Sequence, residues 1–135
     1  MELDNAMAIS ASGLKAQSLR MRVIAENLAN QDSVVPAVDG NPYQRKVVVF
    51  RDVLDRKTGV QTVKVDRVTV DRSPFRQEYS PGHPAADERG YVRKPNVDGL
   101  VESTDMKEAQ RSYEANLNAI EAAKTLTMRT VDLLR

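Results

Sequence analysis

The sequence predicts an α+β fold in which long N- and C-terminal helices pair as a coiled coil, with a small β-rich insert between them. Near the N-terminal end, apolar residues recur at alternating spacings of four and three, and near the C-terminal end they lie close to one helix face. The middle has short alternating runs of valine. Aspartyl-glycine pairs at 39–40 and 98–99 mark the joints. We expect a coiled-coil helix over 1–33, a β-rich insert with extended loops over 34–97, and a second coiled-coil helix over 98–135 that packs with the first.

The first segment has the heptad spacing of a coiled-coil seam. The seam series is Leu3, Met7, Ser10, Leu14, Gln17, Met21, Ile24 and Leu28. Six of these eight positions are apolar. A helix over them would be about 40 Å long. Asn30, followed by three polar residues, predicts the end of the helix.

Two asparagines lie near the end of this helix, although asparagine is a mediocre helix former. Asn27 falls about 60° from Ile24, at the edge of the apolar stripe. A buried amide needs hydrogen-bond partners, so a polar residue in a seam penalises wrong registers by roughly 1–3 kcal/mol per unmet group. Register control is the interpretation we favour. The alternative, that Asn27 and Asn30 only cap the helix end, stays open.

The middle of the chain predicts short strands. Residues 46–50 read KVVVF, a typical strand. Valines alternate with polar residues over 63–65 and again over 68–70, and the slip between the two runs predicts a bulge or turn at 66–67. Proline and glycine then predict loop or extended chain over 73–95.

The last segment mirrors the first. Asp105 is a possible helix cap, with an alternative start nearer Val101, and neither Gly nor Pro interrupts the segment up to Leu134. Its apolar face consists of Met106, Ala109, Tyr113, Leu117, Ile120, Ala123, Val131 and Leu134. Asn116 lies inside this stripe and is a second candidate for register control. Such a helix needs a partner to bury its stripe.

The residues give little support to enzyme chemistry, and we expect no catalytic, metal or cofactor site. There is no cysteine, and the single histidine, His83, lies between prolines with only Asp87 and Glu88 nearby as further ligands. The six glycines are scattered singly, so no phosphate-binding loop is indicated.

Charge and hydropathy indicate whether the chain binds nucleic acid, protein or membrane. The net charge of +1 argues against nucleic acid, and the short cluster of Arg89, Arg93 and Lys94 favours a protein contact or plain surface. No segment approaches the ~20 apolar residues of a membrane span. The acidic start of the sequence predicts that no cleaved secretory signal is present.

Several motifs together resemble bacterial flagellar rod and hook proteins. ISASGLKAQ at 9–17 and AENLAN at 25–30 match the N-terminal signature of this family, and RSYEAN at 111–116, after the DM pair at 105–106, matches its C-terminal one. NPYQRKVVVF at 41–50 narrows the resemblance to a component of the proximal rod. The resemblance covers essentially the whole chain.

The resemblance implies a structural subunit that assembles helically through its terminal helices and transmits torque from the motor to the distal rod and hook. It implies partners among copies of the chain and other rod proteins, with the membrane-embedded ring and export apparatus at the base. It also implies export by the flagellar type III system into a rod that spans the periplasm. The expected assembly interface is Leu3, Met7, Leu14, Met21, Ile24, Asn27, Leu28, Asn30, Met106, Tyr113, Asn116, Leu117, Ile120, Val131 and Leu134.

One alternative belongs to a different functional class. A long helical seam also suits an export chaperone or adaptor that binds another chain along it. A stably helical monomer or dimer with high affinity for one export substrate would favour the adaptor, whereas axial assembly would favour the rod subunit.

Overall fold

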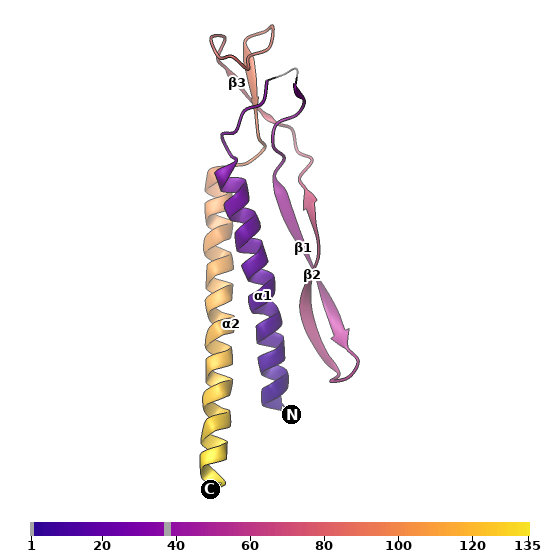
Figure 1. The fold of residues 1–135 in the computed structure, drawn as a ribbon, viewed down its shortest axis with the longest axis vertical. Coiled ribbons are helices and arrows are strands. Elements are labelled where there is room, and N and C mark those ends of the chain that lie inside the picture. Colours follow the sequence, from indigo (N-terminus) through magenta and orange to yellow (C-terminus); the bar gives the residue numbers. More distant parts are fainter. Residues whose placement is uncertain (1, 37–38) are drawn as a thin grey trace. The chain divides into compact units, whose positions relative to one another are not determined.

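The computed structural model describes residues 2–36 and 39–135 and has two long helices with four strands between them. The elements in chain order are α1 (Glu2–Ala29), β1 (Lys46–Asp55), β2 (Val60–Val70), β3 (Arg76–Tyr79), β4 (Tyr91–Lys94) and α2 (Gly99–Leu133). Figure 1 shows this arrangement, which confirms the α+β fold with terminal helices in contact and a β-rich insert.

Contacts along the chain form two compact units. The first contains the chain up to Met21, Val48–Arg67 and Lys107–Arg135, and the second contains Arg22–Val47 and Val68–Met106. Each unit therefore includes part of α1 and part of α2. The sequence predicts three consecutive segments, 1–33, 34–97 and 98–135, and this domain division remains a prediction.

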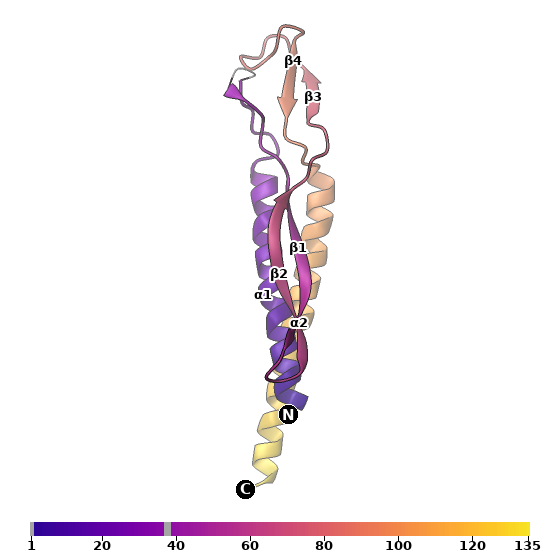
Figure 2. The ribbon, with the colours of Figure 1, turned by 90° about the vertical axis from the view of Figure 1, so that its right-hand side faces the viewer.

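In the first unit, α1 and α2 pack side by side (Figures 1 and 2). A guanidinium nitrogen of Arg20 lies 3.7 Å from the carboxylate of Glu108, and Gly13 faces the side-chain amide of Asn116. The contact nearer the start of α1 is made by a residue nearer the end of α2, so the helices are antiparallel. A Cβ atom on Gly13 would lie 2.7 Å from Nδ2 of Asn116, which shows how closely the two helices approach.

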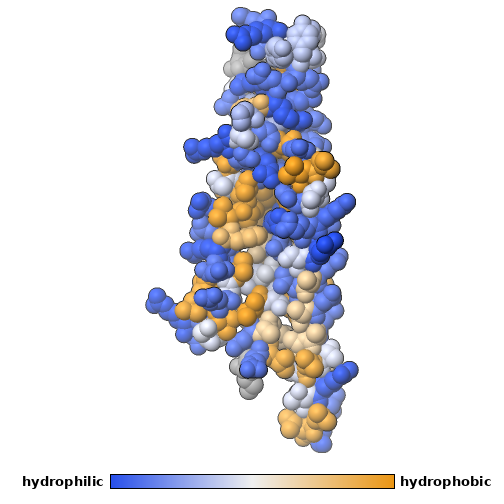
Figure 3. Space-filling view, turned by 180° about the vertical axis from the view of Figure 1, so that it is seen from behind, coloured by the Kyte–Doolittle hydropathy of each residue, from blue (hydrophilic) through white to orange (hydrophobic). Residues whose placement is uncertain are grey.

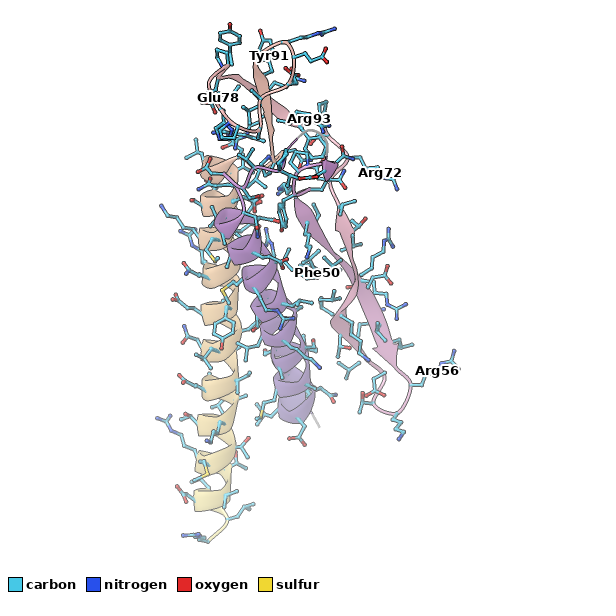
Figure 4. All side chains as sticks on the ribbon, turned by 45° about the horizontal axis from the view of Figure 1, so that its top comes forward. Phe50, Arg56, Arg72, Glu78, Tyr91 and Arg93 are labelled. Atoms are coloured by element: carbon cyan, nitrogen blue, oxygen red, sulfur yellow. The ribbon has the colours of Figure 1, made fainter. Side chains whose placement is uncertain are left out.

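Most of the β1–β2 hairpin also belongs to the first unit and lies beside α1, away from α2 (Figures 1 and 2). The backbone N–H of Val63 donates to the Ser12 hydroxyl at 3.2 Å, which fastens β2 to α1. Gly59 has φ +72°, which favours glycine at the turn between the strands. Figure 4 shows Arg56 pointing away from the hairpin at this turn.

The strand prediction for residues 46–50 is confirmed, since β1 begins at Lys46. Of the bulge or turn expected at 66–67, the turn is wrong, because β2 runs uninterrupted from Val60 to Val70. The bulge stays a prediction. Side chains along a strand alternate between the two faces of the sheet. Among the described residues, no second layer packs against the outer face of this two-stranded sheet, so a change in which face the valines occupy need not end the strand.

The second unit contains a small hairpin that the sequence did not predict. Antiparallel β3 and β4 pair Arg76 with Lys94 and Tyr79 with Tyr91, within a region expected to be loop or extended chain. The rings of Tyr79 and Tyr91 stack edge to face with centroids 5.3 Å apart. Three consecutive residues of β3 are polar and all four are exposed, so β3 lacks the alternation that predicts a strand.

The core is thin and differs between the units. The buried apolar residues of the second unit include Val23, Ile24, Ala85, Val92 and Val97. Those of the first unit are Ala16, Val60, Ala109 and Ala123. Since buried alanine removes little apolar area from water, the first unit gains less from burial. Neither helix, as far as the chain is described, has an apolar stretch long enough to cross a bilayer.

Candidate assembly interface

The predicted seam residues of α1 lie mostly at its edge against the rest of the chain. Ile24 is buried. The half-buried seam residues of α1 are Leu3, Met7, Leu14, Met21 and Leu28. Two further buried residues, Ala16 and Val23, are outside the predicted series. Ala16 lies one turn after Ser12, on the side of α1 that bonds the hairpin, and periodicity alone cannot reveal this second packing partner.

On α2 the predicted residues divide into covered and exposed groups. Met106, Tyr113 and Ile120 are half-buried, beside the buried Ala109 and Ala123. Leu117, Val131 and Leu134 are exposed. The α1-facing side of α2 thus uses small residues, and several large apolar residues of the predicted stripe remain available to other chains.

Asn27 is buried, with 1% of its surface exposed, and all of its hydrogen-bonding groups have partners. Its Nδ2 donates to the Lys46 carbonyl at 2.9 Å, and its Oδ1 accepts from the Lys46 N–H at 2.9 Å. The side-chain amide thereby pairs with the first residue of β1 much as a neighbouring strand would. The Tyr43 hydroxyl donates to Oδ1 at 2.7 Å, and Nδ2 also lies 3.3 Å from a Glu102 oxygen.

Glu102, in the first turn of α2, is fully buried and also contacts Arg45. Nε of Arg45 donates to the Glu102 carboxylate, and the other guanidinium nitrogens lie 3.4 Å from Asp71 and Asp105. A buried carboxylate is costly unless it is paired and hydrogen-bonded. Arg45 and Asn27 meet this requirement, so in the second unit α1, α2 and the chain before β1 are joined through polar groups. We call Asn27, Tyr43, Arg45, Glu102 and Asp71 the polar junction.

The polar junction shifts the titration of its members. Burial, together with the smaller effects of the charges of Glu26 and Glu102, raises the pKa of Tyr43 to about 12. Burial alone would lower the pKa of Arg45, but hydrogen bonds and charges from Glu102 and Asp71 outweigh it and raise this pKa. Hydrogen bonds from Ser73, with a smaller effect of Arg45, lower the pKa of Asp71. Arg45 and Asp71 are therefore charged at neutral pH, and Tyr43 is neutral.

The other two asparagines have different surroundings. Nδ2 of Asn30 donates to the Glu26 carbonyl at 2.8 Å, which caps the end of α1. Asn116 lies against Gly13 in the first unit. From the sequence, Asn27 and Asn30 could either cap the helix or control its register. Asn30 makes the contact of a helix cap. Asn27 instead bonds the chain around β1 and the start of α2.

The C-terminal part of α2 exposes apolar side chains. After Ala123 every residue is exposed, and Leu133 and Leu134 have 86% and 83% of their surface free. Gly13 lies opposite Asn116, so the start of α1 lies near residue 127 and the end of α2 extends past it (Figure 1). Figure 3 shows hydrophobic side chains at this end of α2. Exposed apolar surface of this kind marks contacts with other chains.

His83 has a structural contact. Its Nδ1 accepts the N–H of Ala85 at 3.0 Å within the loop between β3 and β4. Among residues 2–36 and 39–135, no three His, Cys, Asp or Glu side chains converge in a way that would hold a metal ion.

Comparisons with known proteins identify the family. The model described as "Flagella basal body rod protein" matches residues 7–35, and the one described as "Flagellar basal body rod FlgEFG protein C-terminal" matches residues 88–133. The flagellar basal-body rod protein FlgC of Agrobacterium fabrum is 47% identical over 133 residues, which cover 98% of this chain and 96% of the relative. The chain belongs to the FlgC family. FlgC of Salmonella typhimurium is 43% identical over 98% of both chains, and FlgC of Bacillus subtilis is 38% identical over 96% of both.

The FlgC assignment confirms the predicted function. The chain is a structural subunit of the proximal rod of the flagellar basal body, and its family is not enzymatic. The export-adaptor alternative is set aside, because the matches to FlgC extend over nearly the full length of the chain.

Proposed function

We propose that this FlgC chain assembles helically with copies of itself and with other rod proteins, and transmits torque from the motor to the distal rod and hook. The observation that carries the proposal is the exposed apolar end of α2, which extends past the start of α1 and has no covering segment among the described residues. At the base, the assembly meets the membrane-embedded ring and the export apparatus.

The proposed interface combines contacts within and between subunits. Apolar residues of α1 support the helix pair: Leu3, Met7, Leu14, Met21, Ile24 and Leu28. On α2, Met106, Tyr113 and Ile120 are partly covered, whereas Leu117, Val131 and Leu134 are free to contact a neighbouring copy. Asn27 acts as a polar register element, since a shifted helix would leave its amide unpaired. Asn30 contributes to the interface by capping α1, and Asn116 by packing against Gly13.

Export through the flagellar type III system, without a cleaved signal peptide, and insertion into a periplasm-spanning rod complete the proposal. The alanine-lined core of the first unit supports it. Because the first unit buries little apolar area, its free energy of unfolding is small, and it can unfold readily to pass through a narrow export channel. Packing against neighbouring subunits in the rod then orders the helices.

Complementation tests the function directly. In the source bacterium with its own copy deleted, the wild-type chain should restore rods, hooks and swimming. Val131→Glu with Leu134→Glu should abolish all three, because charges at the exposed end of α2 prevent apolar packing. The purified variant should keep wild-type helical content by circular dichroism, because both positions are exposed.

The matched control introduces two negative charges at exposed positions of the β1–β2 hairpin, Thr58→Glu and Gln61→Glu. It should swim normally. If the wild-type chain failed to restore rods, the proposed function would be wrong. Full swimming by the Val131→Glu, Leu134→Glu variant would show that the end of α2 is not an assembly contact.

A further inference from the structure

One face of α2 forms an exposed strip that its own chain does not cover. At spacings of four and three, the strip consists of Gln110, Glu114, Leu117, Glu121, Lys124, Met128 and Val131, with Arg135 just past the end of the helix. All eight residues are exposed, including three large apolar side chains. Such spacing is the geometry of a helix–helix contact. The strip lies to one side of Ala109, Asn116 and Ala123, which face α1 or are buried.

A face of α1 forms a second exposed strip with the same spacing. It consists of Asp4, Ala8, Ala11, Lys15, Ser18, Arg22, Ala25 and Ala29. All eight are exposed, and five of them are alanine or serine. This strip points away from both partners of α1, since Ser12 bonds the hairpin and Gly13 faces α2. Small side chains let another helix approach closely.

We propose that the α2 strip of one copy packs against the α1 strip of a second copy of this chain. The charges fit this occupant. Lys15 and Arg22 are seven residues apart on α1, and Glu114 and Glu121 are seven residues apart on α2. None of the four forms an ion pair within the part of the chain that the structure describes. Equal spacing lets both pairs form at once, whichever way the two helices run.

Side-chain size fits as well. When the two ion pairs form in an antiparallel arrangement, Ser18 lies opposite Leu117 and Ala8 lies opposite Met128. In a parallel arrangement Leu117 again meets Ser18, and Met128 meets Ala29. In each case a large side chain of α2 meets a small one of α1, so the large residues fill the space that the small ones leave.

The contact explains how copies form a chain rather than a closed pair. Each subunit carries one strip of each kind, so a subunit can use its α2 strip toward one neighbour and its α1 strip toward another. Head-to-tail contacts of this type generate open helical assemblies unless the rotation closes a ring. This inference rests on the proposed helical assembly and names the surfaces through which copies meet.

Two charge-reversal variants test the contact. Lys15→Glu with Arg22→Glu sets acidic residues against Glu114 and Glu121. Glu114→Lys with Glu121→Lys sets basic residues against Lys15 and Arg22, so copies of either variant repel one another at the paired positions. In a mixture, each variant offers the strip that the other needs. We expect loss of swimming with either variant alone and recovery to near the wild-type rate when the two are expressed together in the deletion strain. Purified, each should associate at least tenfold more weakly than wild type in sedimentation, and the equimolar mixture should recover association.

The control separates repulsion between strips from a general effect of the charge change. Arg56→Glu with Lys57→Glu, at the hairpin turn, makes the same charge change as the α1 variant but leaves both strips unaltered (Figure 4). Expressed alone, it should swim and associate like the wild-type chain. Normal swimming of the single-strip variants, or failure of the mixture to recover both readouts, would overturn the inference. A third outcome distinguishes this inference from the proposed function. If the purified mixture recovers association but the wild-type chain does not restore swimming in the deletion strain, the strip contact is upheld and the proposed rod function is rejected.

Discussion

Single buried polar residues join the second unit. Glu102 and Asn27 are almost completely inaccessible to solvent, yet each is hydrogen-bonded to segments far away in the sequence. The sequence could predict that Asn27 needs partners, because an amide in a seam must be satisfied. It could not identify them, since the Lys46 backbone is 19 residues away and Glu102 is 75 residues away.

Glu102→Ala should lower the free energy of unfolding by about 3 kcal/mol, because it leaves Arg45 and Asn27 without a buried carboxylate partner. Urea unfolding followed by circular dichroism measures the change. Glu108→Ala on the same helix is the control. Its pair with Arg20 is 3.7 Å long and largely exposed, so a loss of only about 0–1 kcal/mol is expected. Equal losses at the two positions would mean that the junction does not stabilise the fold.

Tyr43 predicts how stability changes at alkaline pH. Its pKa is raised to about 12 in the folded chain, from 10.0 in the unfolded one, so the folded state holds the phenolic proton more tightly. This stabilisation is complete below about pH 10 and is lost as the pH rises toward about 12. Tyr43→Phe should be destabilised by about 1 kcal/mol at neutral pH, through the lost hydrogen bond to Asn27.

The difference in unfolding free energy between wild type and Tyr43→Phe should shrink as the pH rises from about 9 to about 11. Urea midpoints at both pH values measure it. A constant difference would show that Tyr43 ionises normally in the folded chain.

At the scale of elements, the two helices were predictable and the small strands were not. The 3.6-residue pattern, the joint at Gly99 and the polar end at Asn30 all agree with helices over Glu2–Ala29 and Gly99–Leu133. The β3 strand has four exposed residues, so no hydrophobic alternation marks it. It exists because Arg76 and its neighbours pair with β4, and Arg76 also bonds the carbonyls of Pro95 and Gln31.

The close approach of α1 and α2 at Gly13 gives a prediction for the helix pair. Glycine inside a helix usually costs roughly 1 kcal/mol relative to alanine, so Gly13→Ala would normally stabilise. Here the added Cβ would lie 2.7 Å from Nδ2 of Asn116, and the gain should be cancelled or reversed. In an Asn116→Ala background, the same Gly13→Ala change should gain about 1 kcal/mol.

Thermal or urea unfolding of the four chains completes this double-mutant cycle. The expected coupling between the two positions is about 1 kcal/mol. Additive effects would mean that the helices do not pack at Gly13 in solution.

At the scale of the whole molecule, the two units differ in how many buried contacts stabilise them. The second unit combines the polar junction with buried Val23, Ile24, Val92 and Val97, whereas the first buries mainly alanine. Sequence periodicity predicted one uniform seam along both helices. It could not show that the end of α1 and the start of α2 join residues 30–47 and 68–98 in a separate unit, because that depends on contacts between distant segments.

Hydrogen exchange on the dilute, purified chain tests most directly whether this protein is a subunit completed by its neighbours. We predict slow exchange in the second unit, including residues 22–29 and 99–106 of the helices, and fast exchange at 2–21 and 107–133. Assembly into rods should slow exchange along the whole of both helices. Slow exchange along both entire helices in the dilute monomer would contradict the account, because the first unit would then be stable without a partner.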